Sequence, residues 1–301
     1  MSILQKVRYA ENWNIGFCEQ TPTELLLKQG LNKIEWLKHS YKDRWFADPF
    51  IYKVTDTEIV VFIEECPIEN SKGILCELVV DRKSKVLKER YVLLELDTHL
   101  SYPCIIKHEG KTYVYPENGA SGQLNLYEYD ENHHRLINPI TIIEEALVDA
   151  TIWKQDKVYY MLATKAPNVQ EKAYLYKSTS LFGKFVQVGE LPIQSNRKYS
   201  RQGGNWFEVN NKLYRPAQDC VVRYGSALSI MKVDKQMETY KEYLQFQLQP
   251  NTKKYQLGLH TLNFHEGICV IDAYGYLYPW LGRVYYSAFS RKVIQLIKRV
   301  K

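Results

Sequence analysis

Apolar and aromatic runs along the chain come in pairs, and a short polar turn joins the two members of each pair. Five pairs are present, and they read DPFIYK-VTDT-EIVVFIEE, YPCIIK-HEG-KTYVYPEN, DATIWK-QD-KVYYMLATK, GGNWFEV-NN-KLYRPAQD and HTLNF-HEG-ICVIDAY. Short turns rich in Asn, Asp and Gly between apolar runs are typical of β-hairpins. The pattern therefore predicts five hairpins in an all-β fold.

The pairs recur at a nearly constant spacing. A polar or charged residue precedes each pair, and the steps between these markers are 51, 50, 52 and 59 residues, from Asp48 through His99, Asp149 and Arg201 to His260. A repeat of this length with several strands in each unit is typical of propeller blades. We therefore predict a five-bladed β-propeller.

Further apolar segments supply the remaining strands. In the first four units they are 73–80 and 92–95, 122–129 and 137–144, 173–177 and 185–188, and 227–233 and 240–246, which gives about four strands a unit. The lead-in, residues 1–44, holds an apolar stretch at Trp13–Cys18 and a short helical segment near Thr23–Leu27. The apolar stretch offers a strand that would complete the last blade and remove an open sheet edge.

The pattern changes after Ser287. Apolar side chains there recur at helical spacing, and they are Phe289, Val293, Ile294, Leu296, Ile297 and Val300. Residues 283–301 also carry six basic side chains and no acidic one. We predict a propeller over 1–286 and a short basic amphipathic C-terminal helix over 287–301. Such a helix would bind a membrane surface or a partner, or else pack on the propeller with a solvated basic face.

Composition narrows the setting of the protein. The chain has 301 residues and a formal charge of +6, and because the basic excess is concentrated in the tail, we expect no nucleic acid polymer as a partner. No segment resembles a signal peptide, and no apolar run is long enough to cross a bilayer. The six cysteines lie far apart without a CxxC pair. This favours a reduced, cytoplasmic location, peripheral at the inner face of the membrane if the tail binds there, and no zinc site.

The residues before the innermost strands are the candidates for chemistry. These strands begin near the axis of a propeller, so we expect Asp48, Tyr102, Asp149, Arg201 and His260 to be neighbours. Carboxyl groups that meet in this way suit sugar chemistry, whereas Arg and His would hold an anionic group. Structural roles are the alternative: a turn cap for Asp48, a backbone hydrogen bond for Asp149, ion pairs for the arginines and a satisfied buried histidine for His260.

Several motifs resemble known families. Ala47-Asp48-Pro49-Phe50 is similar to a motif of the five-bladed propellers of glycoside hydrolase family 43, in which the Asp is the general base. A closer resemblance is to the N-terminal propeller domain of plant glucosamine inositolphosphorylceramide transferases and of bacterial formyltransferase-like proteins. It is carried mainly by residues 46–50, 99–103 (HLSYP), 115–117, 149–151, 214–220 (YRPAQDC) and 260–261. The resemblance implies a propeller related to glycan-processing enzymes, with Asp48 as the base.

One position departs from the family 43 pattern. Those hydrolases place a Glu general acid at the start of the fourth blade, where this chain reads Ser200-Arg201-Gln202-Gly203-Gly204. An acid would then come from Glu64, Glu117 or Asp219. Alternatively, an arginine pair of Arg201 and Arg215 would suit a nucleotide sugar or a lipid-linked pyrophosphate, whose leaving group needs little acid catalysis.

We therefore predict a glycosyltransferase that forms a glycosidic bond in bacterial surface polysaccharide or glycolipid biosynthesis. A family 43-like hydrolase and a non-catalytic glycan-binding propeller are the alternatives. The catalytic candidates are Asp48, Asp149, Glu117 and Glu64, and the substrate-binding candidates are His99, Tyr102, Arg201, Arg215, Gln218, Asp219 and His260. The expected partners are a sugar donor and a glycan or lipid-linked acceptor. No cofactor and no metal is expected, because Walker, GxGxxG, HExxH and GxSxG motifs are missing.

Overall fold

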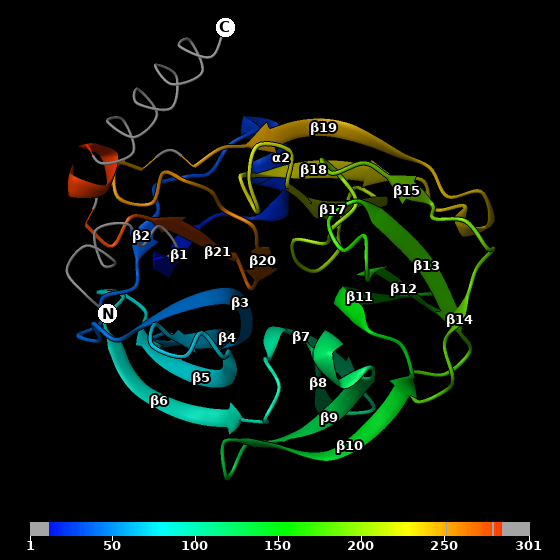
Figure 1. The fold of residues 1–301 in the computed structure, drawn as a ribbon, viewed down its shortest axis with the longest axis horizontal. Coiled ribbons are helices and arrows are strands. Elements are labelled where there is room, and N and C mark those ends of the chain that lie inside the picture. The colour runs from blue at the N-terminus through cyan, green and yellow to red at the C-terminus, as the bar shows by residue number, and fades with distance from the viewer. Residues whose placement is uncertain (1–11, 251, 279, 285–301) are drawn as a thin grey trace, which may run out of the picture.

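The computed structural model describes residues 12–250, 252–278 and 280–284, and it confirms a five-bladed β-propeller (Figure 1). A short helix over 280–284 follows the last blade, so the predicted C-terminal helix is present but begins earlier than expected. The predicted amphipathic segment, 287–301, lies entirely outside the described residues. The division of the chain after residue 286 therefore stays a prediction.

Blades 1 to 4 are antiparallel sheets formed by consecutive strands. Blade 1 holds β3 (Arg44–Val54), β4 (Glu58–Pro67), β5 (Ile74–Asp81) and β6 (Leu87–Leu94), and blade 2 holds β7 (Ser101–His108), β8 (Lys111–Glu117), β9 (Leu124–Asp130) and β10 (Arg135–Ile143). Blade 3 holds β11 (Leu147–Gln155), β12 (Val158–Lys165), β13 (Lys172–Ser178), β14 (Val186–Gln187) and β15 (Gln194–Ser195), and blade 4 holds β16 (Phe207–Val209), β17 (Lys212–Asp219), β18 (Ala227–Val233) and β19 (Glu242–Leu248). Two 3-10 turns, η1 (Gly119–Ser121) and η2 (Met237–Thr239), lie in connections.

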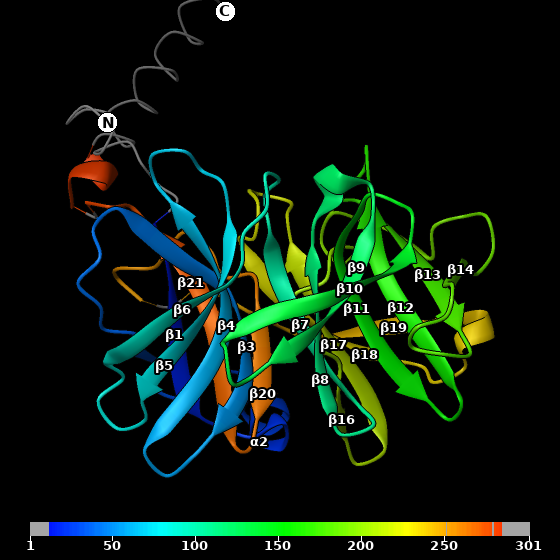
Figure 2. The same ribbon diagram turned by 90° about the horizontal axis from the view of Figure 1, so that it is seen from below.

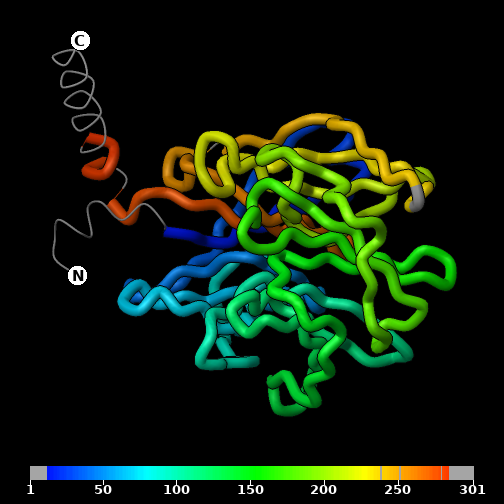
Figure 3. The backbone as a smooth tube through the Cα atoms, turned by 45° about the vertical axis from the view of Figure 1, so that its right-hand side comes forward, coloured from blue at the N-terminus to red at the C-terminus, as the bar shows by residue number. Residues whose placement is uncertain are grey.

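Blade 5 is built from both ends of the chain. Its sheet has the order β2-β1-β21-β20, with β20 (Leu262–His265) innermost, then β21 (Ile268–Gly275), β1 (Asn12–Glu19) and β2 (Glu35–Trp36). Figure 3 shows the blue N-terminal strand beside the orange C-terminal segment. The lead-in therefore completes the last blade as predicted, and the predicted short helix is α2 (Pro22–Lys28), which begins with a capping box at Thr21.

The hairpin turns explain why the repeat is visible in the sequence. In four of the five hairpins the turn holds one or two residues with positive φ, and these are Glu109-Gly110, Asp156, Asn210-Asn211 and Glu266-Gly267. Gly and Asn adopt this conformation at little cost, and it matches the twist of the strands that the turn joins.

The hairpin turns lie at one end of the blades, which we call the lower face, where α2 also lies (Figure 2). The opposite end, the upper face, carries the longer connections 68–73, 118–123, 166–171 and 220–226 and the helix 280–284.

A bulge interrupts the innermost strand of three blades at the same place. Asp48, Tyr102 and Asp149 have φ of 49°, 47° and 48°, and each lies where the pairing with the next strand slips. Bulges of this kind change the direction in which a side chain points. Here they bring the three side chains toward the axis of the ring.

Candidate active site on the propeller axis

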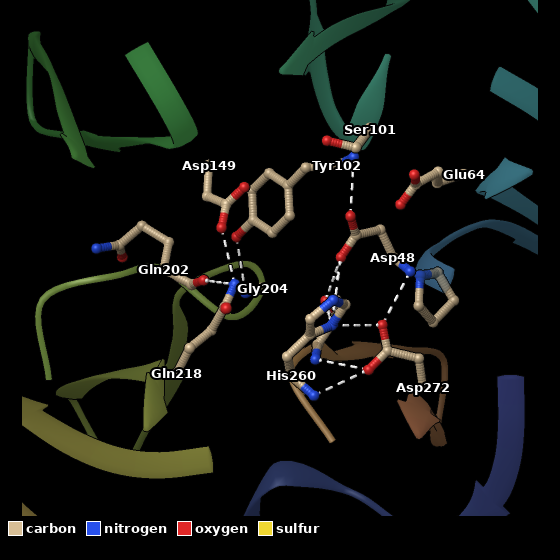
Figure 4. A network of polar contacts seen from close by, with 12 residues as sticks. Asp48, Glu64, Ser101, Tyr102, Asp149, Gln202, Gly204, Gln218, His260 and Asp272 are labelled. Atoms are coloured by element: carbon tan, nitrogen blue, oxygen red, sulfur yellow. Dashed lines mark hydrogen bonds and ion pairs between the residues drawn. The ribbon is translucent and has the colours of Figure 1, made fainter. Parts of the chain in front are cut away.

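Asp48 lies at the centre of a buried polar cluster (Figure 4). Its carboxylate accepts hydrogen bonds from the Thr261 hydroxyl at 2.5 Å and from the Tyr102 backbone N–H at 3.1 Å. Only 4% of the residue is exposed. One donor comes from blade 5 and the other from blade 2, so three blades meet at this carboxylate.

Asp272 in β21 fixes the surroundings of Asp48. Its two oxygens accept hydrogen bonds from the backbone N–H groups of Asp48, His260 and Thr261, at 2.9, 3.0 and 2.9 Å, and from His260 Nδ1 at 2.7 Å. Four donors use all the acceptor positions of a carboxylate. The His260 ring also lies 3.6 Å from Asp48 Oδ1 and stacks on Trp13 of β1, with 4.0 Å between ring centroids.

A second cluster is centred on Asp149 in β11. Arg201 Nε donates to Asp149 Oδ2 at 2.6 Å, and Gln218 Nε2 donates to the same oxygen at 2.7 Å. Arg201 Nη2 lies 3.8 Å from Glu117 Oε2, and the guanidinium lies over the Tyr224 ring at 5.0 Å. The charge of Arg201 is therefore already shared between two carboxyl groups, and this Arg is less available to an anionic ligand than the sequence suggested.

The Tyr102 ring lies between the two clusters (Figure 4). Its hydroxyl is 2.9 Å from the Thr151 hydroxyl of blade 3 and accepts the Gly204 N–H of blade 4 at 2.7 Å. The residue is fully buried. Tyr102 therefore bridges the axis, and its role in binding substrate stays a prediction.

Glu64 and His99 form the edge of the Asp48 cluster. His99 Nδ1 accepts the Gly73 N–H at 2.9 Å, so the proton of the neutral ring is on Nε2, which lies 3.1 Å from Glu64 Oε1. A Cβ on Gly73 would lie within 2.8 Å of both side chains, so only Gly fits there. Glu64 raises the pKa of His99, whereas the Gly73 N–H opposes a second proton on the ring.

Burial shifts the acid–base properties of both clusters. It raises the pKa of Asp48 to about 8 against the opposing charge of His260. Burial would lower the pKa of His260, but the Asp272 and Asp48 carboxylates outweigh this effect and raise it to about 9. Burial and Asp149 raise the pKa of Glu117 to about 7, although Arg201 acts in the other direction. Two carboxyl groups thus exchange protons near neutral pH, as a general base and a general acid must.

The clusters are reached from the upper face. Their exposed members are the His99 side chain, 44% exposed, and Tyr224 in the connection 220–226, 37% exposed. Two buried acceptors, Gln218 Oε1 and Asn118 Oδ1, have no hydrogen-bond partner within the described part of the chain. Buried acceptors are normally satisfied, so hydroxyl groups of a ligand are suitable partners for them.

Three ligand atoms in the first cluster lie close enough together to hold a metal ion, within 4.8 Å of one another on Asp48, His260 and Asp272. The Asp272 oxygens, however, already accept hydrogen bonds from four donors, and one of these donors is the His260 ring. The residues thus satisfy one another, and we assign no metal to them.

Arg215 does not belong to the axial clusters. It is fully buried inside blade 4, where its Nε and Nη2 donate to the Glu242 carboxylate at 2.7 Å each and Nη2 donates to the Tyr199 carbonyl. The two arginines thus have different carboxylate partners, and the role of Arg215 in binding substrate stays a prediction.

Asp219 also has a structural role. One of its oxygens accepts the Val221 N–H at 3.0 Å and the other accepts Gln247 Nε2 at 2.9 Å, and within the described residues it forms no ion pair with either arginine. It shapes the connection 220–226, and the hydrogen-bonding of both its oxygens leaves it a poor candidate for an acid.

The sequence pattern did not single out Asp272 or Thr261. Asp272 interrupts the apolar run ICVIDAY, and an acidic residue inside a buried strand was the only available signal. Thr261 was noted only as the neighbour of His260. Of the predicted residues, the structure brings Asp48, Glu64, His99 and His260 into one cluster and Glu117, Asp149, Arg201 and Gln218 into the other, as described above.

The described residues contain no helix that is long and apolar enough to span a membrane.

Comparison of folds agrees with the observed architecture. Similar solved structures include an alpha-L-arabinanase of Cellvibrio cellulosa in complex with arabinohexaose, with a TM-score of 0.51, 14% identity and coverage of 67% of this chain and 76% of that one. An exo-beta-1,3-galactanase of Phanerochaete chrysosporium with galactose has a TM-score of 0.52, 11% identity and coverage of 67% and 49%. At these identities the likeness shows the fold alone.

Comparison of sequences identifies the family. The chain is 28% identical over 212 residues to glucosamine inositolphosphorylceramide transferase 1 of Arabidopsis thaliana, which covers 66% of this chain and 27% of the relative. The protein of the same name in Oryza sativa subsp. japonica is 27% identical over 209 residues, 67% of this chain and 28% of the relative. The chain thus matches only about a quarter of the length of these relatives. The model of the family "Glucosamine inositolphosphorylceramide transferase 1, N-terminal" matches residues 34–265, most of the chain, and the chain belongs to this family.

Proposed function

We propose that this propeller is a carbohydrate-active enzyme that transfers a glycosyl group, with Asp48 as the general base. The observation that supports it best is a buried carboxyl group on the axis with a pKa raised to about 8, held by donors from two neighbouring blades. A base needs a pKa close to the working pH and a fixed position. A relative named glucosamine inositolphosphorylceramide transferase 1 and an alpha-L-arabinanase of the same fold support the substrate class.

The proposed reaction takes a sugar from an activated donor, either a nucleotide sugar or a lipid-linked sugar pyrophosphate. The oxygen of an acceptor hydroxyl bonds to the anomeric carbon of the donor sugar. Asp48 accepts the proton of that hydroxyl in the same step. The bond from that carbon to the phosphate oxygen breaks, and the phosphate leaves as an anion. Such a leaving group needs little protonation, and this fits the missing acid at the start of blade 4, where Arg201 is paired with Asp149.

The finer assignment is a role in the biosynthesis of a bacterial surface polysaccharide or glycolipid, in the cytoplasm. Its support within the chain is that the six cysteines are all buried, and that five of them, Cys18, Cys76, Cys104, Cys220 and Cys269, form no disulfide within the described residues, which suits a reducing compartment.

Glycoside hydrolysis is a second candidate, and one observation favours it. Glu117 has a pKa raised to about 7 and lies beside Arg201 in the second cluster, so it is able to donate a proton near neutral pH. Glu117 would then replace the acid that family 43 hydrolases hold in the fourth blade. Asp48 would activate a water molecule in place of an acceptor hydroxyl.

The test uses radiolabelled nucleotide sugars and a membrane extract that supplies acceptors. Wild-type protein is expected to incorporate label, and Asp48→Asn is expected to lose at least about a hundredfold in rate, since a general base contributes on the order of 10²–10⁴. Asn tolerates the positive φ of this position. Asn keeps only one acceptor oxygen for the Thr261 and Tyr102 donors, so some stability should be lost, and a thermal melt checks that the variant is folded.

Asp156→Asn is the matched control, because Asp156 also has a positive φ, 55°, but lies in an exposed hairpin turn on the lower face. It should keep full activity. Failure of the wild type to incorporate label from any donor would argue against transfer. Release of free sugar from oligosaccharides without a donor would favour hydrolysis, and sugar binding that survives Asp48→Asn without turnover would favour a glycan-binding role.

A further inference from the structure

Two apolar protrusions stand on the upper face, and the first of them borders the axial clusters through Tyr224. The first is the connection 220–226 between β17 and β18, where Val221 and Val222 are 57% and 77% exposed. The second follows β21, where Trp280 and Leu281 are 74% and 44% exposed. Large apolar side chains that gather on one face of a protein often mark a surface that binds a partner or a membrane.

Each protrusion is anchored to the propeller, so both are defined features of the fold. The Tyr274 hydroxyl of β21 donates to the Tyr224 carbonyl in the first protrusion at 2.9 Å. In the second, Arg283 donates to the Lys253 carbonyl, and a Cβ on Gly282 would lie 2.5 Å from the Tyr276 ring. The first contact also ties blade 4 to blade 5. The protrusions thus belong to neighbouring blades and lie at the same end of the ring (Figure 2).

Basic residues accompany both apolar groups. Arg223 lies between Val222 and Tyr224 in the sequence, and Arg283 follows Leu281 by two residues. Next to the second protrusion is a cavity of about 1220 Å³ whose lining includes Tyr278, Lys42 and Lys254. Exposed tryptophan and aliphatic side chains beside cations are the combination that binds the interface of an anionic bilayer.

We propose that this face docks on an anionic lipid surface. Val222, Trp280 and Leu281 enter the headgroup region, where Trp is favoured, and the adjacent arginines contact lipid phosphates. An anionic bilayer is favoured over a protein partner because exposed Trp and aliphatic side chains stand beside cations in both protrusions. The same face carries His99 and Tyr224, the exposed members of the axial clusters. Docking would therefore turn the site toward the membrane and toward a lipid-linked acceptor, and only this last step rests on the proposed function.

The test is co-sedimentation of the full chain with vesicles of phosphatidylcholine, alone or mixed with phosphatidylglycerol. Binding is expected only to the anionic vesicles, and it should weaken as salt is raised. The double variant Val222→Ser/Trp280→Ser should lower the vesicle partition coefficient roughly tenfold or more, because it removes the inserted apolar area without changing the charge. Both residues are exposed, so the variant should melt at the temperature of the wild type.

Leu27→Ser is the matched control, since Leu27 is 78% exposed but lies on α2 at the lower face. It should bind vesicles as the wild type does. The catalytic variant Asp48→Asn should also bind normally, so that loss of activity and loss of docking are separate results.

Two outcomes would contradict the proposed docking surface. Either the double variant sediments with anionic vesicles as Leu27→Ser does, or the wild type does not bind them. If the wild type instead self-associates in size-exclusion chromatography and the double variant does not, the face is a contact between copies of the protein.

Discussion

The residues that carry the site occupy strained backbone positions. Asp48, Tyr102 and Asp149 share a left-handed conformation at equivalent bulges. Asp adopts it with local hydrogen bonds, but a bulky side chain pays on the order of 1–2 kcal/mol. Tyr102 is retained in this conformation by its contacts with Thr151 and Gly204 and by the N–H that it gives to Asp48. The strained backbone at Tyr102 thus places the N–H group that holds the proposed base, Asp48.

The pKa values of the two carboxyl groups distinguish the two candidate reactions by pH. Transfer with Asp48 as the only proton-transfer group requires it to be ionised, so the rate should rise with pH through about 8 and then level off. Hydrolysis also requires a protonated Glu117, whose pKa is about 7. Its rate should therefore be bell-shaped, with flanks near 7 and 8. The measurement is kcat/KM from pH 5.5 to pH 9.5, taken in roughly half-unit steps.

Glu117→Gln provides the matched control for this profile. It should abolish the alkaline flank and most of the rate if Glu117 is the acid, and it should change little if the enzyme is a transferase. A profile that is flat between roughly pH 6 and pH 9 would contradict both assignments, because the rate would then depend on no group with a pKa in this range.

At the scale of the strands, Asp272 joins β21 to the start of β20 and to β3. It accepts three buried backbone N–H groups from Asp48, His260 and Thr261. Asp272→Ala leaves these donors unsatisfied, and each unsatisfied buried donor costs about 1–3 kcal/mol. The free energy of unfolding should therefore fall by about 3 kcal/mol or more. Denaturant titration measures this loss, and Asp56→Ala, at an exposed turn position, should change it by less than about 0.5 kcal/mol.

Asp272→Asn is a milder variant of the same test. The amide keeps one acceptor oxygen but turns an NH₂ group toward backbone donors, so we expect an intermediate loss of stability. A loss in Asp272→Ala no larger than that in the exposed control would show that the three N–H groups find other partners.

The strands could be predicted because each hairpin has a local sequence signal, a short polar turn between two apolar runs. Four of the five turns contain residues with positive φ, and each of these four includes a Gly, Asn or Asp at such a position. The contacts between blades have no such local signal. Arg201 and Arg215 are close in sequence, yet one reaches Asp149 on the axis and the other reaches Glu242 inside blade 4. Spacing alone placed Asp48 and Asp149 correctly because the repeat brings equivalent positions to the axis, but it could not show which partners neutralise the arginines.

At the scale of the whole molecule, the ring is closed by the pairing of β1 with β21 along the full length of β1. Ile15 in β1 is fully buried in a core that includes Ile59 and Ile63 of blade 1. The first strand is therefore part of the interface between the first and last blades, and the ends of the chain stabilise each other. A propeller closed in this way has no exposed edge at the junction.

Closure of the ring predicts that a core substitution in β1 destabilises the whole propeller. Ile15→Ala should lower the free energy of unfolding by about 2–5 kcal/mol, the usual cost of removing this much buried side chain. Ile59→Ala in blade 1 should cost about as much, and Ile140→Ala, at a position 37% exposed, should cost much less. Each variant should unfold in one transition with an unchanged dependence on denaturant. If Ile15→Ala instead shows an early partial transition, with the other blades as stable as before, then β1 is an appended strand and the ring does not depend on it for closure.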